Sequence, residues 1–336
     1  MGSVLSVTVC CVYCLLLGQR LFRKRSSAVL IASVVCFLPQ VLFVGFFQNN
    51  DSLSLAAVSM MLYYLACGYD DHFSVKTCLK LGIAFSVGLL SYYSVYGWIL
   101  AGIVFCVVSV CLDPDVPHKG SLILRRGLLI AGVCLVLAGW FFIRNAVLHE
   151  GDFFGISTEL RAREAMRNQG AVLYEMNSAR EGCVSVLRFI GESGFPWLKT
   201  TAISFIGVFG YLDAVMPAAC YIAYLAFFLA GFVLFIASCR RERPDRQETL
   251  LTAVLLAAAL ITLLLSFLQS YTRNYQPQGR YVITAVLPLA FIIARGADRA
   301  VLPGRSGRAF SPAAVLTVLW LLMGAGALLI LLPQVT

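Results

Sequence analysis

Long apolar runs recur along almost the whole sequence, and they limit what the chain can fold into. Each run is close to the ~20 residues that a helix needs to cross ~30 Å of hydrocarbon. Hydrophobic residues make up 60% of the chain and charged residues 13%, whereas an ordinary soluble domain is about half apolar and about a quarter charged. Backbone groups in lipid are satisfied only in helices or closed barrels, and no strand-like alternation is present. The sequence therefore predicts an all-α, polytopic integral membrane protein.

About ten transmembrane helices are expected. The runs are Val4–Gly18, Ala28–Phe46, Leu53–Gly68, Val75–Leu90, Trp98–Leu112, Leu128–Ile143, Pro217–Ser238, Leu250–Leu268, Tyr281–Ala294 and Ala313–Leu332. Between Val75 and Leu112 we predict a helical hairpin that turns at Ser91–Tyr96, because tyrosines suit the membrane interface.

The spans divide the chain into three parts: N-terminal helices over 1–143, a polar loop over 144–200, and C-terminal helices over 201–336. The loop is too short for an independent hydrophobic core, so it is expected to lie against the bundle or the bilayer. Ser157 and Thr158 are predicted to cap a short helix over 159–167.

The distribution of basic residues predicts the orientation, since cytoplasmic loops collect Lys and Arg. Alternate loops hold 17 of the 26 basic residues and 8 of the 17 acidic ones, so they carry the entire net charge of +9. The opposite loops have no net charge. This split places the N-terminus and the polar loops on the extracytoplasmic side of a bacterial plasma membrane. Topology accounts for the basic excess, and nucleic acid is not an expected partner.

Most of the twelve cysteines lie in or beside apolar runs, where Cys behaves as a small hydrophobe. Cys10, Cys11 and Cys14 have a metal-like spacing, but no His or carboxylate accompanies them. No metal site is therefore expected there.

One group of polar residues, Asn49, Asn50 and Asp51, interrupts the apolar sequence between two predicted spans. A polar group at the mouth of a helix bundle is costly unless it meets water, a partner or a ligand, which makes it a functional candidate. The alternative is a turn in which Asp51 caps the helix that begins at Ser52.

A second group stands directly before the ninth span. Two amides, a cation and a phenol, contributed by Gln276, Gln278, Arg280 and Tyr281, can grip phosphate or sugar hydroxyls, with Arg280 as a planar bidentate donor. The alternative is an ordinary Arg/Tyr anchor at the level of the headgroups.

Four motifs occur in order along the chain. They are Phe37-Leu38-Pro39-Gln40 through Asn49-Asn50-Asp51-Ser52-Leu53, then Trp140–Asn145 with Gly151-Asp152, then Ser204–Tyr211, and finally Gln278-Gly279-Arg280-Tyr281 with Leu287-Pro288. Together they resemble a bacterial polytopic membrane family of unassigned function that is grouped with the GT-C glycosyltransferases.

The resemblance implies a GT-C-like bundle that transfers a sugar from a polyprenyl-phosphate donor to a glycan, lipid or protein acceptor on the extracytoplasmic face. The transfer needs a carboxylate as base for the acceptor hydroxyl; Asp51, Asp152 and Asp213 are the candidates on this face, and Asp51 is the choice if the chain acts alone. The implied substrate-binding residues are Asn49, Asn50, Arg144, Asn145, Asp152, Gln276, Gln278, Arg280 and Tyr281. Either cations or a divalent metal would steady the departing phosphate.

The chain departs from the superfamily pattern at its start. It is expected to lack the usual first helix and the first acidic loop, where the catalytic carboxylate usually lies, and to begin at the second helix with Val4-Leu5-Ser6-Val7. Two alternatives stay open. One is a non-catalytic membrane protein that binds a lipid-linked glycan or a partner, and the other is a transporter or flippase. A transporter usually has charged residues or broken helices near the middle of the membrane, and no charged residue lies deep within the predicted spans.

Overall fold

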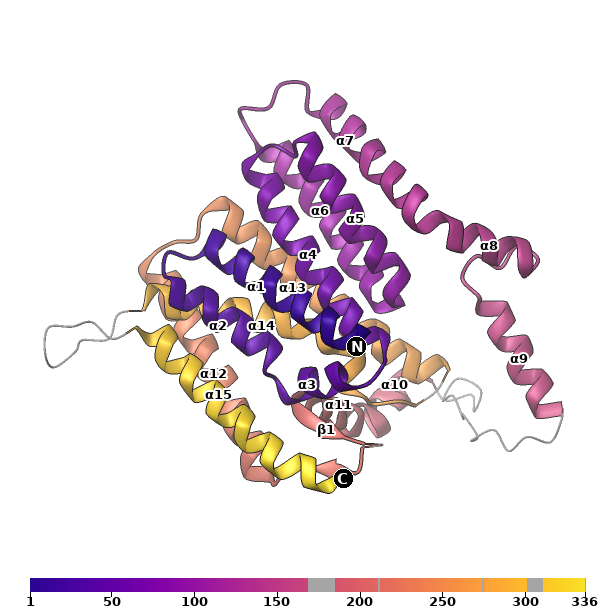
Figure 1. The fold of residues 1–336 in the computed structure, drawn as a ribbon, viewed down its shortest axis with the longest axis vertical. Coiled ribbons are helices and arrows are strands. Elements are labelled where there is room, and N and C mark those ends of the chain that lie inside the picture. The colour runs from indigo at the N-terminus through magenta and orange to yellow at the C-terminus, as the bar shows by residue number, and fades with distance from the viewer. Residues whose placement is uncertain (169–184, 211, 274, 301–310, 336) are drawn as a thin grey trace, which may run out of the picture.

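The computed structural model describes residues 1–168, 185–210, 212–273, 275–300 and 311–335, and it is almost entirely helical there (Figure 1). The first elements are α1 (Gly2–Leu21), α2 (Arg25–Cys36), α3 (Pro39–Phe46), α4 (Asn50–Asp70), α5 (Val75–Ser91), η1 (Tyr93–Val95), α6 (Tyr96–Leu112), α7 (Lys119–Cys134), η2 (Leu135–Gly139) and α8 (Trp140–Leu148). The remaining helices are α9 (Ile156–Asn168), α10 (Val186–Phe189), η3 (Ile190–Gly194), α11 (Phe195–Gly207), α12 (Ala218–Arg241), α13 (Arg246–Thr272), η4 (Gly279–Ala285), α14 (Val286–Arg299), α15 (Pro312–Leu331) and η5 (Leu332–Gln334). Two short strands, β1 (Val208–Phe209) and β2 (Ala214–Val215), pair antiparallel.

The predicted all-α polytopic fold is confirmed. Among the described residues, eight helices are long and apolar enough to cross a membrane, and the bent pair α2–α3 makes a ninth. The remaining expected span, Val75–Leu90, is α5, whose 17 residues are at the short end of the range for a transmembrane helix. The described residues therefore hold eight spans, nine with the bent pair, and α5 as a short one, in agreement with the expected number of about ten. The predicted hairpin turn is confirmed, because η1 connects α5 to α6.

The second expected span is broken by a 60° bend between α2 and α3. Pro39 is the first residue of α3, and Leu38 before it is extended, with φ −63° and ψ 129°. Proline lacks an N–H and disfavours helical geometry in the preceding residue, so α2 ends there. The bend lets α3 pack against α11, β1 and η4.

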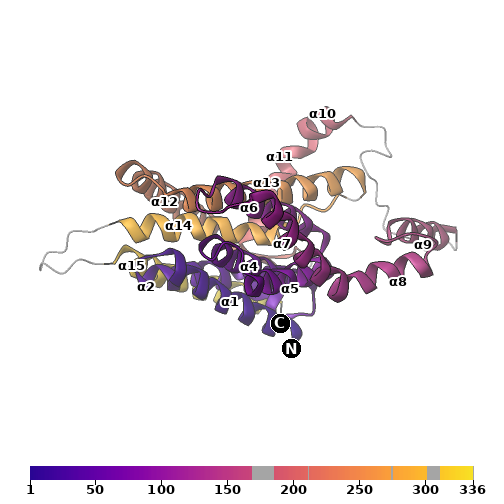
Figure 2. The same ribbon diagram turned by 90° about the horizontal axis from the view of Figure 1, so that it is seen from above.

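The most buried span is η4–α14, with 83% of its apolar stretch inside the protein. It runs through the middle of the bundle between α12 and α2 (Figures 1 and 2). Glycines permit the close contact with α12. A Cβ on Gly296 would lie 2.6 Å from the backbone nitrogen of Phe235, and one on Gly231 would lie 2.4 Å from Ile293. Small residues allow membrane helices to approach in this way.

We name the two ends of the bundle after residues of the spans that reach them. The Arg280 end holds the start of α4, the α5–α6 turn, the end of α11 and η4. The Glu248 end holds the links α1–α2, α6–α7 and α12–α13 and the end of α14.

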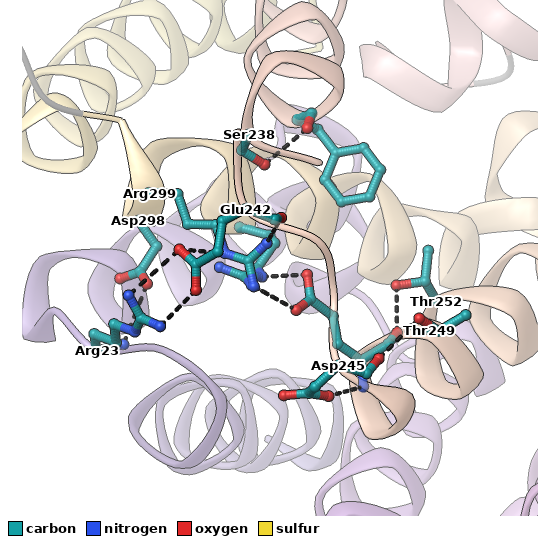
Figure 3. Close-up of polar contacts among 11 residues, drawn as sticks. Arg23, Ser238, Glu242, Asp245, Thr249, Thr252, Asp298 and Arg299 are labelled. Atoms are coloured by element: carbon teal, nitrogen blue, oxygen red, sulfur yellow. Dashed lines mark hydrogen bonds and ion pairs between the residues drawn. The ribbon is translucent and has the colours of Figure 1, made fainter. Parts of the chain in front are cut away.

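Buried ion pairs fasten α14 at the Glu248 end (Figure 3). Glu248 of α13 accepts hydrogen bonds from Arg295 and from Arg299, the latter at 2.9 Å. The side chains of these three residues are only 10%, 7% and 5% exposed. Asp298 accepts from the backbone nitrogens of Arg23 and Lys24 at 3.3 and 3.0 Å. The network therefore joins α13 and α14 to the α1–α2 link.

These contacts correct the sequence interpretation at this end of the bundle. Glu248 and Arg295 lie just outside the expected spans Leu250–Leu268 and Tyr281–Ala294, in loops that the charge distribution predicts to be cytoplasmic. Both helices are longer than expected, since α13 begins at Arg246 and α14 ends at Arg299. Ion pairing allows the charged residues to lie inside the helix contacts.

The segment α7–η2–α8 departs from the bundle. Its 30 residues give a length of about 45 Å, more than the ~30 Å of hydrocarbon. Only 6% of its apolar stretch is buried, and α8 and α9 project from the bundle in both views (Figures 1 and 2). An ion pair of 2.8 Å between Arg273 and Glu159 ties α9 to the end of α13.

The network predicts that Glu248→Ala is strongly destabilising. The substitution would leave the buried Arg295 without a carboxylate and Arg299 with only its longer pair to Glu242, at 3.5 Å. Breaking a buried ion pair costs about 3–5 kcal/mol. We expect the midpoint of thermal unfolding in detergent to fall by several degrees. The control is Glu192→Ala, which removes the exposed i,i+4 pair with Arg188 and should cost less than about 0.5 kcal/mol. Equal midpoints for the two variants would contradict the role assigned to Glu248.

Candidate functional site

Six elements, several of them distant in sequence, meet at the Arg280 end. η4 packs against α11, α13, α4 and α3, and β1 packs against α3 and α11. A cavity of about 390 Å³ lies among α3, α11, β1 and η4. Its lining is contributed by Gln40, Phe43, Phe47, Ser204, Val208, Gly210, Leu212, Gln278, Gly279 and Arg280.

Gly279 fixes the backbone of η4 against α11. A Cβ at this position would lie 2.0 Å from the backbone nitrogen of Phe205, which no side chain can tolerate. The Gly279 N–H donates a 2.7 Å hydrogen bond to the Ser204 hydroxyl. The residue after it, Arg280, therefore starts from a tightly constrained backbone position.

Only some of the hydrogen-bond donors of the Arg280 guanidinium have a partner among the described residues. One of its terminal nitrogens donates to the Tyr281 hydroxyl at 3.3 Å, and its guanidinium carbon lies 5.1 Å from the centre of the Tyr281 ring. Its Nε is buried without a hydrogen-bond partner among the described residues. A planar guanidinium with unused donors at a cavity wall is suited to a phosphate or carboxylate.

Tyr281 is itself held in place by neighbouring side chains. Its hydroxyl donates to Gln276 Oε1 at 2.7 Å, and its ring stacks on Tyr92 with centroids 6.2 Å apart. Gln276 itself donates through its backbone to Ser270 at 3.3 Å. The two predicted site residues Gln276 and Tyr281 therefore orient Arg280, while Gln278 and Arg280 line the cavity.

Asp51 lies in the first turn of α4 with 7% exposure. No described residue donates a hydrogen bond to its carboxylate, and its charge interacts with that of Arg280. A buried carboxylate usually has hydrogen-bond partners, so one without them marks a place where a ligand or water can bind. The structure thus brings the predicted carboxylate and the predicted cation into one neighbourhood.

The neighbouring Asn49 is a helix cap. Its side-chain oxygen accepts from the Ser52 nitrogen at 3.0 Å, and its Nδ2 donates to the carbonyls of Val44 and Phe47. These bonds occupy both ends of the amide. The residue that caps α4 is therefore Asn49, and not Asp51 as in the alternative considered from the sequence. Asn50 is exposed at the start of α4.

The structure does not bring the remaining predicted residues to the cavity lining. Arg144 is exposed on the projecting helix α8, and Asn145 donates to the carbonyl of Phe153 at 3.4 Å. Asp152 caps α9, since it accepts from the backbone nitrogens of Thr158 and Ile156 at 2.8 and 3.0 Å. These bonds, that of Thr158 first, lower the pKa of Asp152 far below its usual range. The cap expected from Ser157 and Thr158 is therefore supplied by Asp152 instead.

Two polar cavity residues, Gln40 and Ser204, were absent from the predicted site. Gln40 is buried, and its side-chain oxygen accepts from the Val208 nitrogen at 3.1 Å. Ser204 connects α11 to η4 through Gly279. In the sequence they stand out only as members of the motifs shared with the resembled family. The position of Gln40, a polar amide directly after Pro39 in an apolar run, could have marked it as a candidate functional residue.

No group of three or more His, Cys, Asp or Glu residues suited to a metal ion occurs in the part of the chain that the structure describes.

The close approach at Gly279 predicts that Gly279→Ala separates η4 from α11. An added methyl group would overlap the Phe205 backbone, and such overpacking costs about 1–3 kcal/mol or more. We expect a lower unfolding midpoint together with loss of any ligand binding at the cavity. Gly120→Ala is the matched control, because nothing lies within 4 Å of a Cβ there. A Gly279→Ala variant as stable as that control would contradict the packing.

Comparison with known proteins gives one match. No curated protein and no solved structure matches the chain. A family described as predicted membrane protein (DUF2142) matches residues 5–292, which is most of the chain. The bundle of apolar helices agrees with that description, and the chain belongs to the DUF2142 family of predicted membrane proteins.

Proposed function

We propose that the protein is a GT-C-type glycosyltransferase, or a remnant of one, that uses a polyprenyl-phosphate-linked sugar in cell-envelope glycan assembly. The observation that carries the proposal is that Asp51 lies near enough to Arg280, at one end of the bundle, for their charges to interact without forming an ion pair. Among the described residues, nothing donates a hydrogen bond to the buried Asp51 carboxylate, and the Arg280 guanidinium has unused N–H groups. Glycosyl transfer from a lipid phosphate needs one group of each kind.

The roles follow from the chemistry of the displacement. An acceptor hydroxyl attacks the anomeric carbon, the bond from that carbon to the phosphate oxygen breaks, and the polyprenyl phosphate leaves with the electron pair. A base must take the hydroxyl proton from within hydrogen-bond reach, and we assign this role to Asp51. The charge that develops on the phosphate is best stabilised by preorganised donors, and we assign this role to Arg280.

The cavity also has the mixed character that a lipid phosphate requires. Phe43, Phe47 and Leu212 supply an apolar side, while Gln40, Gln278 and Arg280 supply amide and guanidinium groups. Phe43 is held by stacking on Phe209, with ring centroids 4.5 Å apart. A ligand with a hydrocarbon chain and a charged head would satisfy both sides.

One observation favours a second candidate function. No carboxylate is among the residues that line the cavity itself, so the site also suits a non-catalytic membrane protein that binds a lipid-linked glycan or a partner. In that case Asp51 would serve only to hold Arg280 in place. Substitution of Asp51 separates the two candidates, because a catalytic base affects transfer more than binding.

The orientation is part of the proposal. The loops at the Glu248 end hold the basic excess, so we infer that they face the cytoplasm and that the cavity opens on the extracytoplasmic side of the plasma membrane. Donors linked to polyprenyl phosphate are used on that side by enzymes of the resembled class.

We predict that a cysteine replacing exposed Asn50 reacts with an impermeant thiol reagent on intact cells, whereas one replacing exposed Arg243 reacts only after the cells are opened. The parent chain labelled in parallel supplies the background from its own cysteines. The reverse pattern would invert the topology and remove the proposed extracytoplasmic chemistry.

Substitutions at the pair predict separable effects. Arg280→Lys keeps the charge but offers a mobile point charge in place of two parallel donors, so we expect binding of a short-chain polyprenyl phosphate to weaken at least about tenfold, as it should for Arg280→Ala. Asp51→Asn should leave binding nearly intact and reduce sugar transfer by about 100-fold or more.

Arg144→Lys, on the projecting helix, is the control and should match the parent in binding, transfer and expression. An Arg280→Lys protein with full binding would show that Arg280 is an interfacial anchor. An Asp51→Asn protein with full transfer would remove the catalytic role of Asp51.

A further inference from the structure

A second cavity of about 280 Å³ lies near the Glu248 end, where α7 packs beside α5 and α6. Its walls are apolar and include Phe85 of α5, Ile99 and Ile103 of α6, and Ile130 of α7. The cavity shares no lining residue with the cavity at Arg280.

One charged side chain, Arg126, enters this apolar lining. Its Nε is buried, and no described residue accepts a hydrogen bond from its guanidinium or forms an ion pair with it. Arg126 as a whole is half-buried, and its charge has no counter-ion among the described residues. An anion at this edge of the cavity would supply the partner that its Nε lacks.

The position of Arg126 fits the depth of a lipid headgroup. It lies seven residues after Lys119, the first residue of α7, which places it about 10 Å along the helix. A long arginine side chain can reach the interface from that depth. One side of α7 packs on α5 and α6, but no residue of α7 is fully buried, so its other side stays exposed at the edge of the bundle (Figure 1).

We propose that this cavity binds one anionic phospholipid of the leaflet at the Glu248 end. One acyl chain lies between α5, α6 and α7, and the phosphate is held by Arg126. An acyl chain matches the apolar walls, because an empty apolar cavity does not hold water, and the negative phosphate matches the unpaired guanidinium. The proposal is independent of the one made for the Arg280 end.

The test is native mass spectrometry of the full-length protein exchanged into equimolar dioleoyl phosphatidylglycerol and dioleoyl phosphatidylcholine, which share the same chains. We expect preferential retention of phosphatidylglycerol by the parent. Arg126→Gln should lower that retention by about fivefold or more. Arg125→Gln, on the exposed neighbouring residue, should leave it unchanged.

A second variant fills the space reserved for the chain. Gly127 lines the cavity, and nothing lies within 4 Å of a Cβ built on it, so Gly127→Leu should fold and yet block phosphatidylglycerol. Its control is Gly132→Leu, which is equally uncrowded and lies outside this cavity.

Equal retention of the two lipids, equal losses in Arg125→Gln and Arg126→Gln, or parent-like binding by Gly127→Leu would each overturn the proposal. Glycerophosphate, a headgroup without chains, should not displace the lipid. Displacement by glycerophosphate would instead indicate a site for phosphate alone and would refute the proposed binding of an acyl chain between α5, α6 and α7.

Discussion

The hydrogen bonds from Arg295 and Arg299 to Glu248 set the position of the central helix, on which the rest of the structure depends. At the opposite end of the same span, Gly279 lies against the α11 backbone with no room for a side chain. The span is therefore fastened at both ends, by charge at one and by close contact at the other. Because Arg280 follows Gly279 directly, its place at the cavity is a consequence of how this helix is held.

The cavity at the Arg280 end combines features that are seldom found together on a membrane protein surface. Its aromatic side is built by the bend before Pro39, which turns α3 toward β1 and stacks Phe43 on Phe209. Its polar side comes from η4 and α11, which reach it through the Gly279–Ser204 hydrogen bond. Asp51, in the first turn of α4, is not part of the lining, but its charge interacts with that of Arg280. The ligand class that we propose, an amphipathic anion, would use both the aromatic and the polar side.

The sequence was informative wherever local pattern decides structure. The lengths of the apolar runs predicted the helices and the α5–α6 hairpin. The polar residues at Asp51 and Gln278–Arg280 were also predicted from the sequence as candidate site residues. It was less informative where distant packing decides. Glu248 and Arg295 read as loop charges because only tertiary pairing makes their burial acceptable. Arg144 and Asp152 were grouped with the site because they share its predicted membrane face, but the length of α7–α8 carries them away from the bundle.

The proposed function requires Arg280 and Asp51 to form one site for a lipid-linked phosphate. The most direct measurement is a cryo-electron microscopy structure of the protein in nanodiscs with a short-chain polyprenyl phosphate. We expect phosphate density within hydrogen-bond distance of the Arg280 guanidinium. The polyprenyl chain should lie along Phe43 and Phe47, and Asp51 should face the phosphate. Phosphate density elsewhere, with Arg280 directed to the bilayer headgroups, would contradict it.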